Sequence, residues 1–80
     1  MPELKDMKEL KEKALNYPIE CRIKLRGNQR SPKIFIEWMP EENCFLTTEI
    51  QEKETFFDEQ DLLKDKIGEA LVNNNLVIYE

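Results

Sequence analysis

The sequence predicts an α+β fold: a helix, a three-stranded antiparallel meander, a second helix and a short C-terminal strand, with the helices on one face of the sheet. The segment from Ile19 to Gln51 alternates apolar and polar residues in three runs separated by two turn signals, the pattern of half-buried strands. Both flanking segments repeat apolar residues every three or four positions, as amphipathic helices do. A chain of 80 residues buries only about 60% of its unfolded surface, so we expect one domain, 1–80, with one small core.

The first helix is predicted over residues Pro2–Asn16. Its apolar stripe consists of Leu4, Met7, Leu10, Ala14 and Leu15. Pro2 suits a first helical turn, where its missing N–H costs nothing. The helix is expected to end before Pro18, because the residue that precedes a proline is pushed out of the α region.

The three strands are predicted over residues 19–26, 33–39 and 44–51, with turns at 27–32 and 40–43. Alternation assigns every second residue to the core face. The predicted inward set is Ile19, Cys21, Ile23, Leu25, Ile34, Ile36, Trp38, Cys44, Leu46, Thr48 and Ile50. The predicted outward set is Glu20, Arg22, Lys24, Arg26, Phe35, Glu37, Phe45, Thr47, Glu49 and Gln51.

The second helix carries signals at both ends. Asp58 is a favourable N-cap, and asparagines at 73–75 tolerate the left-handed conformation that ends helices. The predicted buried stripe is Leu63, Ile67, Ala70 and Leu71. Gly68 destabilises a helix by about 1 kcal/mol relative to alanine, which hints at a close contact beside Val72 on the outer side. Residues Leu76–Tyr79 form a β-prone tail that we expect to pair with an edge of the sheet, since an unpaired tail would be a dimer interface or a liability.

The order helix, three strands, helix is similar to that of double-stranded-RNA-binding domains. In that family, lysines at the start of the second helix hold phosphates. Here residues 55–61 read TFFDEQD, and an acidic helix N-terminus repels RNA. The similarity therefore concerns the order of elements and implies no function.

Composition argues against several classes of function. The formal net charge of −5, from 17 acidic and 12 basic residues, disfavours nonspecific binding to nucleic acid or anionic lipid. No long apolar run or signal-peptide pattern is present, so we expect a cytoplasmic protein without a membrane segment. The chain has no histidine and two glycines, which leaves neither the usual general base nor a glycine-rich phosphate loop. We expect no enzyme activity, no cofactor and no metal.

The two cysteines are interpreted as small buried hydrophobic residues. Cys21 and Cys44 are predicted on the first and third strands, about 9–10 Å apart across two strand spacings. A disulfide requires Cα atoms within about 7 Å. A zinc site would need cysteines with carboxylates alone, which is a poor ligand set.

Two candidate binding regions remain. One is the outer face of the sheet, where Phe35 and Phe45 are expected beside Arg22 and Lys24, an arrangement by which RNA-binding sheets stack bases. Cross-strand pairing with glutamates on the same face explains the same residues structurally. The other is charge segregation: the range 22–33 holds five basic and no acidic residues, and 41–61 holds eight acidic residues and one lysine.

The acidic stretch, with Glu41, Glu42 and Glu49, is a candidate surface for docking on a basic partner. The structural alternative is that turns and strand edges simply collect solvated charge.

These patterns lead to the expectation of a small acidic, non-enzymatic protein-binding module: an inhibitor, adaptor or immunity-type protein, of the kind that phages and mobile elements encode as accessory proteins. Its expected partner is a protein, in particular a basic or nucleic-acid-binding one, and the chain itself is expected to be a monomer or weak homodimer. The alternative is a single-stranded nucleic-acid binder using Phe35, Phe45, Arg22 and Lys24, with binding that weakens steeply with salt.

Overall fold

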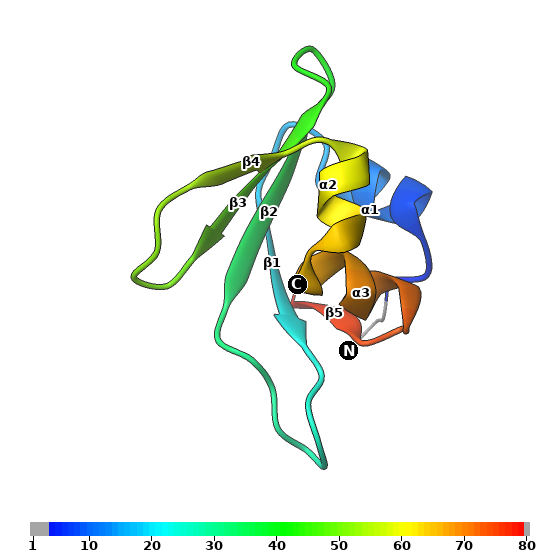
Figure 1. Cartoon of the computed structure of the whole chain (residues 1–80), viewed down its shortest axis with the longest axis vertical. Helices are drawn as coiled ribbons and strands as arrows, with labels where there is room; N and C mark the ends of the chain where they lie inside the picture. The colour runs from blue at the N-terminus through cyan, green and yellow to red at the C-terminus, as the bar shows by residue number, and fades with distance from the viewer. Residues whose placement is uncertain (1–3, 80) are drawn as a thin grey trace.

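The computed structural model describes residues 4–79, which form three helices and a five-stranded antiparallel sheet (Figure 1). The elements are α1 (Met7–Lys13), β1 (Ile19–Ile23), β2 (Ile34–Met39), β3 (Cys44–Glu49), β4 (Thr55–Phe57), α2 (Glu59–Lys64), α3 (Lys66–Val72) and β5 (Leu76–Tyr79). The sheet order is β4-β3-β2-β1-β5. The α+β class is confirmed, and the sheet has one strand more than predicted.

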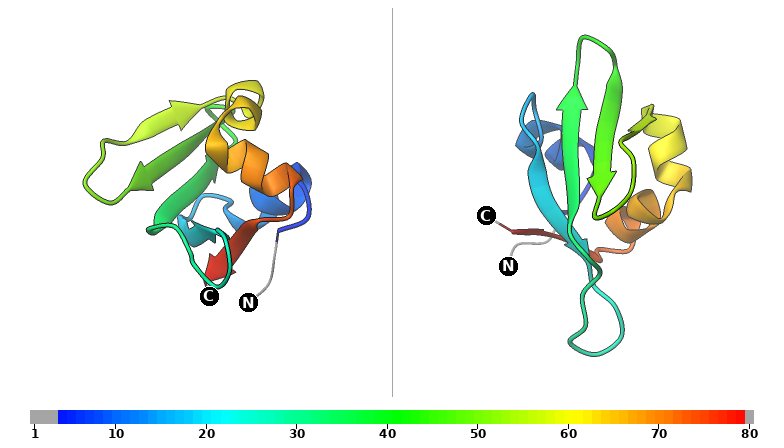
Figure 2. Two further views of the ribbon diagram at one scale, coloured as in Figure 1. Left: turned by 60° about the horizontal axis from the view of Figure 1, so that its bottom comes forward. Right: turned by 90° about the vertical axis from the view of Figure 1, so that its left-hand side faces the viewer.

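The helices pack on one face of the sheet, and the core lies between the two layers. In the right-hand view of Figure 2, α1 lies behind β1 and β2, and α2 and α3 lie beside β3. The core cluster takes residues from every helix and from four of the strands: Leu4, Leu10, Ala14, Cys21, Ile34, Ile36, Trp38, Phe45, Leu62, Ile67, Ala70, Leu71, Leu76 and Ile78. Lys11 of α1 lies over the Trp38 ring, 4.5 Å from its centroid, and pairs with Glu59 of α2 at 3.2 Å.

Helix α1 begins later than predicted. Asp6 is its N-cap, and the carboxylate accepts a hydrogen bond from the Glu9 N–H at 2.8 Å. Glu9 in turn accepts one from the Lys5 N–H at 2.8 Å. This reciprocal capping places the start of the helix after Asp6. Leu4 is instead buried beside the sheet, where its N–H donates to the Leu76 carbonyl at 3.0 Å; residues 2 and 3 of the predicted helix lie outside the described residues.

The predicted facing of β3 is wrong. The hairpin register pairs Trp38 with Phe45 and Glu37 with Leu46, and directly paired residues share a face. Phe45 is therefore fully buried against Trp38, with the ring centroids 4.5 Å apart. Both faces of β3 carry apolar residues, so alternation alone did not show which face is buried. The register between β2 and β3 is determined instead by the inward residues of β2 and by the turn between the two strands.

Strand β4 was not predicted. It pairs with β3 through Phe45–Phe57, Leu46–Phe56 and Thr47–Thr55. The turn before it places Gln51 at a φ of 64°, and Ile50, predicted to be inward, is exposed there. Three residues within a charged stretch are too few to show a period of two.

The predicted second helix is two helices joined at Asp65. The extended ψ of 165° at Asp65 breaks the α geometry, and its carboxylate accepts from the Ile67 N–H to start α3. The break turns Leu62 into the core and leaves Leu63, predicted to be buried, exposed. It also brings Gly68 onto the backbone of α2, so the close contact exists but lies toward α2 and not on the outer side.

Other local signals were confirmed. The Asp58 carboxylate caps α2 by accepting from the Asp61 N–H at 2.7 Å, and Asn74 adopts a φ of 60° at the end of α3. Strand β5 pairs internally with β1. Strand β1 itself ends at Ile23 and not Arg26, because the chain then enters a long loop to β2.

Candidate binding face on the open side of the sheet

The sheet face turned away from the helices carries two cross-strand rows of side chains, and we call it the open face. One row runs Tyr79–Glu20–Phe35–Thr48 and the other runs Glu37–Leu46–Phe56. Within residues 4–79, no helix is placed on this side. Phe35 is 38% exposed and Phe56 is 63% exposed, so two aromatic rings on this face contact solvent.

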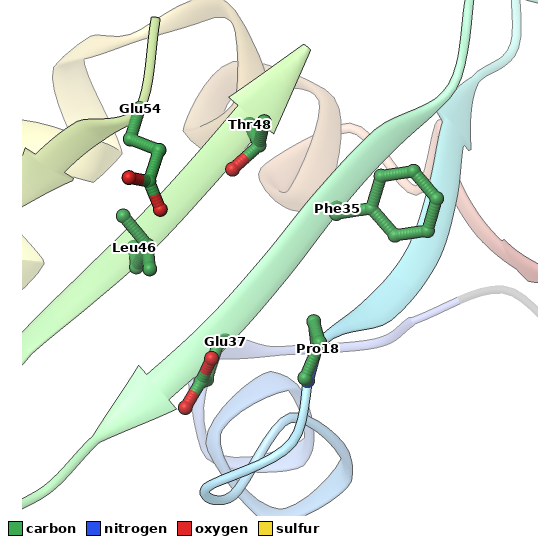
Figure 3. Close-up of a pocket in the computed structure, with 6 residues that line it drawn as sticks. All are labelled: Pro18, Phe35, Glu37, Leu46, Thr48 and Glu54. Atoms are coloured by element: carbon green, nitrogen blue, oxygen red, sulfur yellow. The ribbon is translucent and has the colours of Figure 1, made fainter. Parts of the chain in front are cut away.

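A shallow hollow of about 240 Å³ lies between these rows (Figure 3). Its lining residues come from the position just before β1, from β2 and β3, and from the segment before β4: Pro18, Phe35, Glu37, Leu46, Thr48 and Glu54. Figure 3 shows the side chains of Glu54 and Glu37 on two sides of Leu46, with Phe35 and Pro18 across the hollow. The hollow therefore combines an apolar surface with carboxylates at its border.

The charges on this face are unequally compensated. Arg22 Nε lies 3.9 Å from a Glu20 carboxylate oxygen, and the guanidinium lies 5.1 Å from the centroid of the Tyr79 ring. The 3.9 Å separation is too long for a hydrogen bond, and Nε is buried without another partner. The side-chain carboxylates of Glu37 and Glu54 form no hydrogen bond or ion pair with any residue in the described part of the chain.

The structure separates the residues that the sequence grouped into one aromatic and basic site. Phe35 and Arg22 lie on the open face, but the outward orientation predicted for Phe45 is wrong, because Phe45 is in the core. Glu49, also predicted to be outward, shares the helix side with Ile34 and accepts a hydrogen bond from Lys66 of α3 at 2.7 Å. That hydrogen bond raises the pKa of Lys66 against a smaller opposing effect of burial.

Charge segregation along the sequence becomes separation in space. The backbones of Lys24 and Arg30 form an isolated antiparallel bridge at the base of the loop that joins β1 to β2. This basic loop lies at one end of the long axis of the molecule (Figure 1). Glu41 and Glu42 are exposed in the β2–β3 turn at the opposite end of the 38 Å molecule. The two charge blocks therefore do not form one surface.

Four contributors to the hollow were not predicted as part of a site: Leu46, Thr48, Glu54 and Pro18. Leu46 was assigned to the core, and Glu54 precedes the strand that was not predicted. The four-residue turn between β2 and β3 is the signal that links the facing of the two strands, because it fixes which residues pair.

The cysteines lie on opposite faces of the sheet, so they do not approach each other for a disulfide. Cys21 is fully buried on the helix side, and Cys44 pairs with Met39 on the other. Burial, with a smaller contribution from the Glu20 charge, raises the pKa of the Cys21 thiol to about 12, so it stays protonated at neutral pH.

Residues 4–79 contain neither a cluster of metal ligands nor a membrane-spanning helix. No group of three or more histidine, cysteine, aspartate or glutamate residues there is arranged to hold a metal ion. The same residues contain no helix with the length and apolar character needed to cross a membrane.

Comparison with protein-family models, curated proteins and solved structures found no match for this chain.

Proposed function

We propose that the protein is a non-enzymatic protein-binding module, of the inhibitor, adaptor or immunity type, that docks a partner protein on its open face. The observation that carries the proposal is an uncovered sheet face bearing Phe35, Leu46 and Phe56. An antiparallel sheet with one solvated face usually alternates apolar residues inward with polar residues outward. Here the outward positions of three adjacent strands break that rule.

Exposed apolar side chains that gather in one place mark interaction sites more often than scattered ones do. Phe56 and Leu46 are direct cross-strand neighbours, and Phe35 lies on the adjoining strand and borders the hollow. Aromatic side chains also contribute disproportionately to the binding energy of protein interfaces. A partner that covers this face would remove these side chains from water.

The nucleic-acid alternative receives less support from this geometry. It requires aromatic rings among cations, whereas Phe45 is in the core and the open face presents Glu20, Glu37 and Glu54 against Arg22. Carboxylates at that density repel a phosphate backbone. We therefore favour a protein partner, and charge complementarity favours one with a basic surface.

The proposal extends to the state and location of the chain. We propose a cytoplasmic protein that is monomeric or weakly dimeric. Two cysteines on opposite faces, neither in a disulfide, suit a reducing compartment.

The test is affinity capture from a lysate, with and without nuclease treatment, using three forms of the protein: wild type, the Phe35→Ser, Phe56→Ser double variant, and Val72→Ser as a control. Val72 is 66% exposed on α3, so its replacement removes a comparable exposed apolar group away from the open face. We expect the wild type and the control to retain the same partner and the double variant to lose it while remaining folded by circular dichroism. A partner retained equally by all three, or one released by nuclease, contradicts the proposal.

A further inference from the structure

We propose that the hollow on the open face receives a lysine or arginine side chain from a partner segment that also carries an apolar anchor. The proposal rests on the protein-binding function above and specifies the chemistry of the occupant.

The size of the hollow favours one side chain over a small molecule. Pockets for drug-sized ligands have volumes of about 300–1,000 Å³ and enclose most of the ligand. The hollow has about 240 Å³ and lies open on the surface of the sheet. A side chain that remains attached to a larger docked surface needs no further enclosure.

The lining matches both parts of a long basic side chain. Lysine and arginine bury their methylene groups along apolar surfaces while the charged end stays near polar groups. Phe35, Leu46 and Pro18 offer the apolar surface, and Glu37 and Glu54 offer two carboxylates at its border. A cation over the Phe35 ring would also gain from the negative face of the ring.

The unpaired state of these carboxylates selects a cation over other occupants. Neither Glu37 nor Glu54 has an ion-pair partner among the described residues, so docking of a neutral or acidic segment would desolvate them without compensation. Arg22, which lies on the same face, is directed to Glu20 and Tyr79. The missing positive charge must therefore come from the partner.

A second copy of this chain is the alternative source of that charge. On the open face of such a copy Arg22 is already directed to Glu20 and Tyr79, and the basic loop between β1 and β2 lies at one end of the molecule. Face-to-face pairing of two copies would bring like charges together, which disfavours it.

The test uses displayed libraries of short random peptides as the probe, selected on the immobilised wild-type protein. Affinities of the selected peptides are then measured for wild type, for Glu37→Gln, Glu54→Gln, and for Glu41→Gln, Glu42→Gln as a matched control. The control removes the same net charge at exposed positions at the end of the molecule, so it isolates the local effect.

We expect the selected peptides to carry lysine or arginine within a few residues of an aromatic or aliphatic residue. Loss of the two carboxylates should weaken binding by about tenfold, a size typical of close interfacial charge pairs, and the control should leave it nearly unchanged. Replacement of the peptide's basic residue by norleucine should weaken binding to wild type but not to the Glu37→Gln, Glu54→Gln variant.

The outcomes separate the two proposals. Binders that require Phe35 and Phe56 but are indifferent to Glu37 and Glu54 overturn the basic-occupant inference and leave the docking function standing. Binders indifferent to all four residues, or a library without binders of the open face, contradict the inference. Self-association that sedimentation shows to depend on Glu37 and Glu54 overturns it in favour of a second copy.

Discussion

Replacement of Gly68 by alanine tests the tight packing of α2 against α3. A Cβ atom at this position would lie 2.1 Å from the Leu62 carbonyl oxygen and 2.4 Å from the Leu63 Cα. Both neighbours are backbone atoms, so a rotamer change cannot relieve the overlap. Side-chain propensity alone predicts the opposite sign, because alanine stabilises a helix interior by about 1 kcal/mol relative to glycine.

The magnitude follows from these two opposing effects. Relief of the overlap requires the helices to separate, and overpacking of this kind costs about 3 kcal/mol, at the upper end of the usual range. Subtraction of the propensity gain of about 1 kcal/mol leaves a net destabilisation of about 2 kcal/mol. For a domain of this size, each kcal/mol lowers the melting temperature by about 4–8 °C, so we expect a fall of about 8–16 °C.

Thermal and urea unfolding, followed by circular dichroism, measure this loss. The matched control is Gly27→Ala, because Gly27 has no atom within 4 Å of its added Cβ and is strained only by its φ of 66°. The control should cost about 1 kcal/mol from the left-handed backbone alone. If Gly68→Ala unfolds at the same temperature as wild type or higher, the helix contact is looser than described and the reasoning fails.

Three further predictions concern the core, the thiols and a helix cap. In denaturant unfolding, Phe45→Ala should lower the free energy of unfolding by about 3–5 kcal/mol and Phe35→Ala by less than about 1 kcal/mol. Equal losses of stability would contradict the register of β3. In the native protein Cys44 should react with an alkylating agent and Cys21 should not. Burial raises the pKa of the Cys21 thiol from 9.0 to about 12. The contribution of the buried thiol to the free energy of unfolding is therefore complete below about pH 9 and is lost as the pH rises toward 12. Urea titrations at several pH values should show this loss of stability in wild type and not in Cys21→Val. Asp58→Ala should destabilise by about 0.5–2 kcal/mol and Asp58→Asn by less, and no difference between them would argue against the cap.

Local sequence signals predicted the elements whose cause is local. The Asp58 cap and the left-handed Asn74 each depend on a few neighbouring residues, and both occur as predicted. The inward set predicted for β2 was also correct. Ile34, Ile36 and Trp38 alternate with Phe35 and Glu37, and the first three form the clearly more apolar side of the strand. Where a strand has one clearly more apolar face, the alternation of its residues is sufficient to predict which side chains point to the core.

The failures share a dependence on long-range pairing. Nothing within β3 reveals that Phe45 must face inward, because this follows from its pairing with Trp38. Strand β4 exists only as a partner of β3, and α3 separates from α2 because Asp65 and Gly68 act together across the break. The open-face site was therefore only partly predictable: Phe35 and Arg22 came from alternation, and Leu46, Phe56 and Glu54 required the register.

The composition of the open face separates what folding requires from what binding explains. The outward position of the half-buried Leu46 follows from the burial of Phe45, since a one-residue slip that hid Leu46 would expose the phenylalanine. Phe35 and Phe56 have no such constraint. Each lies between inward-facing neighbours that would keep their places beside a polar residue, so the core gives no reason for either ring. Each instead leaves apolar area in water, at about 25 cal/mol for every Å², which a docked partner would recover. The two rings that the fold does not need are therefore the main support for the proposal that the open face binds a partner.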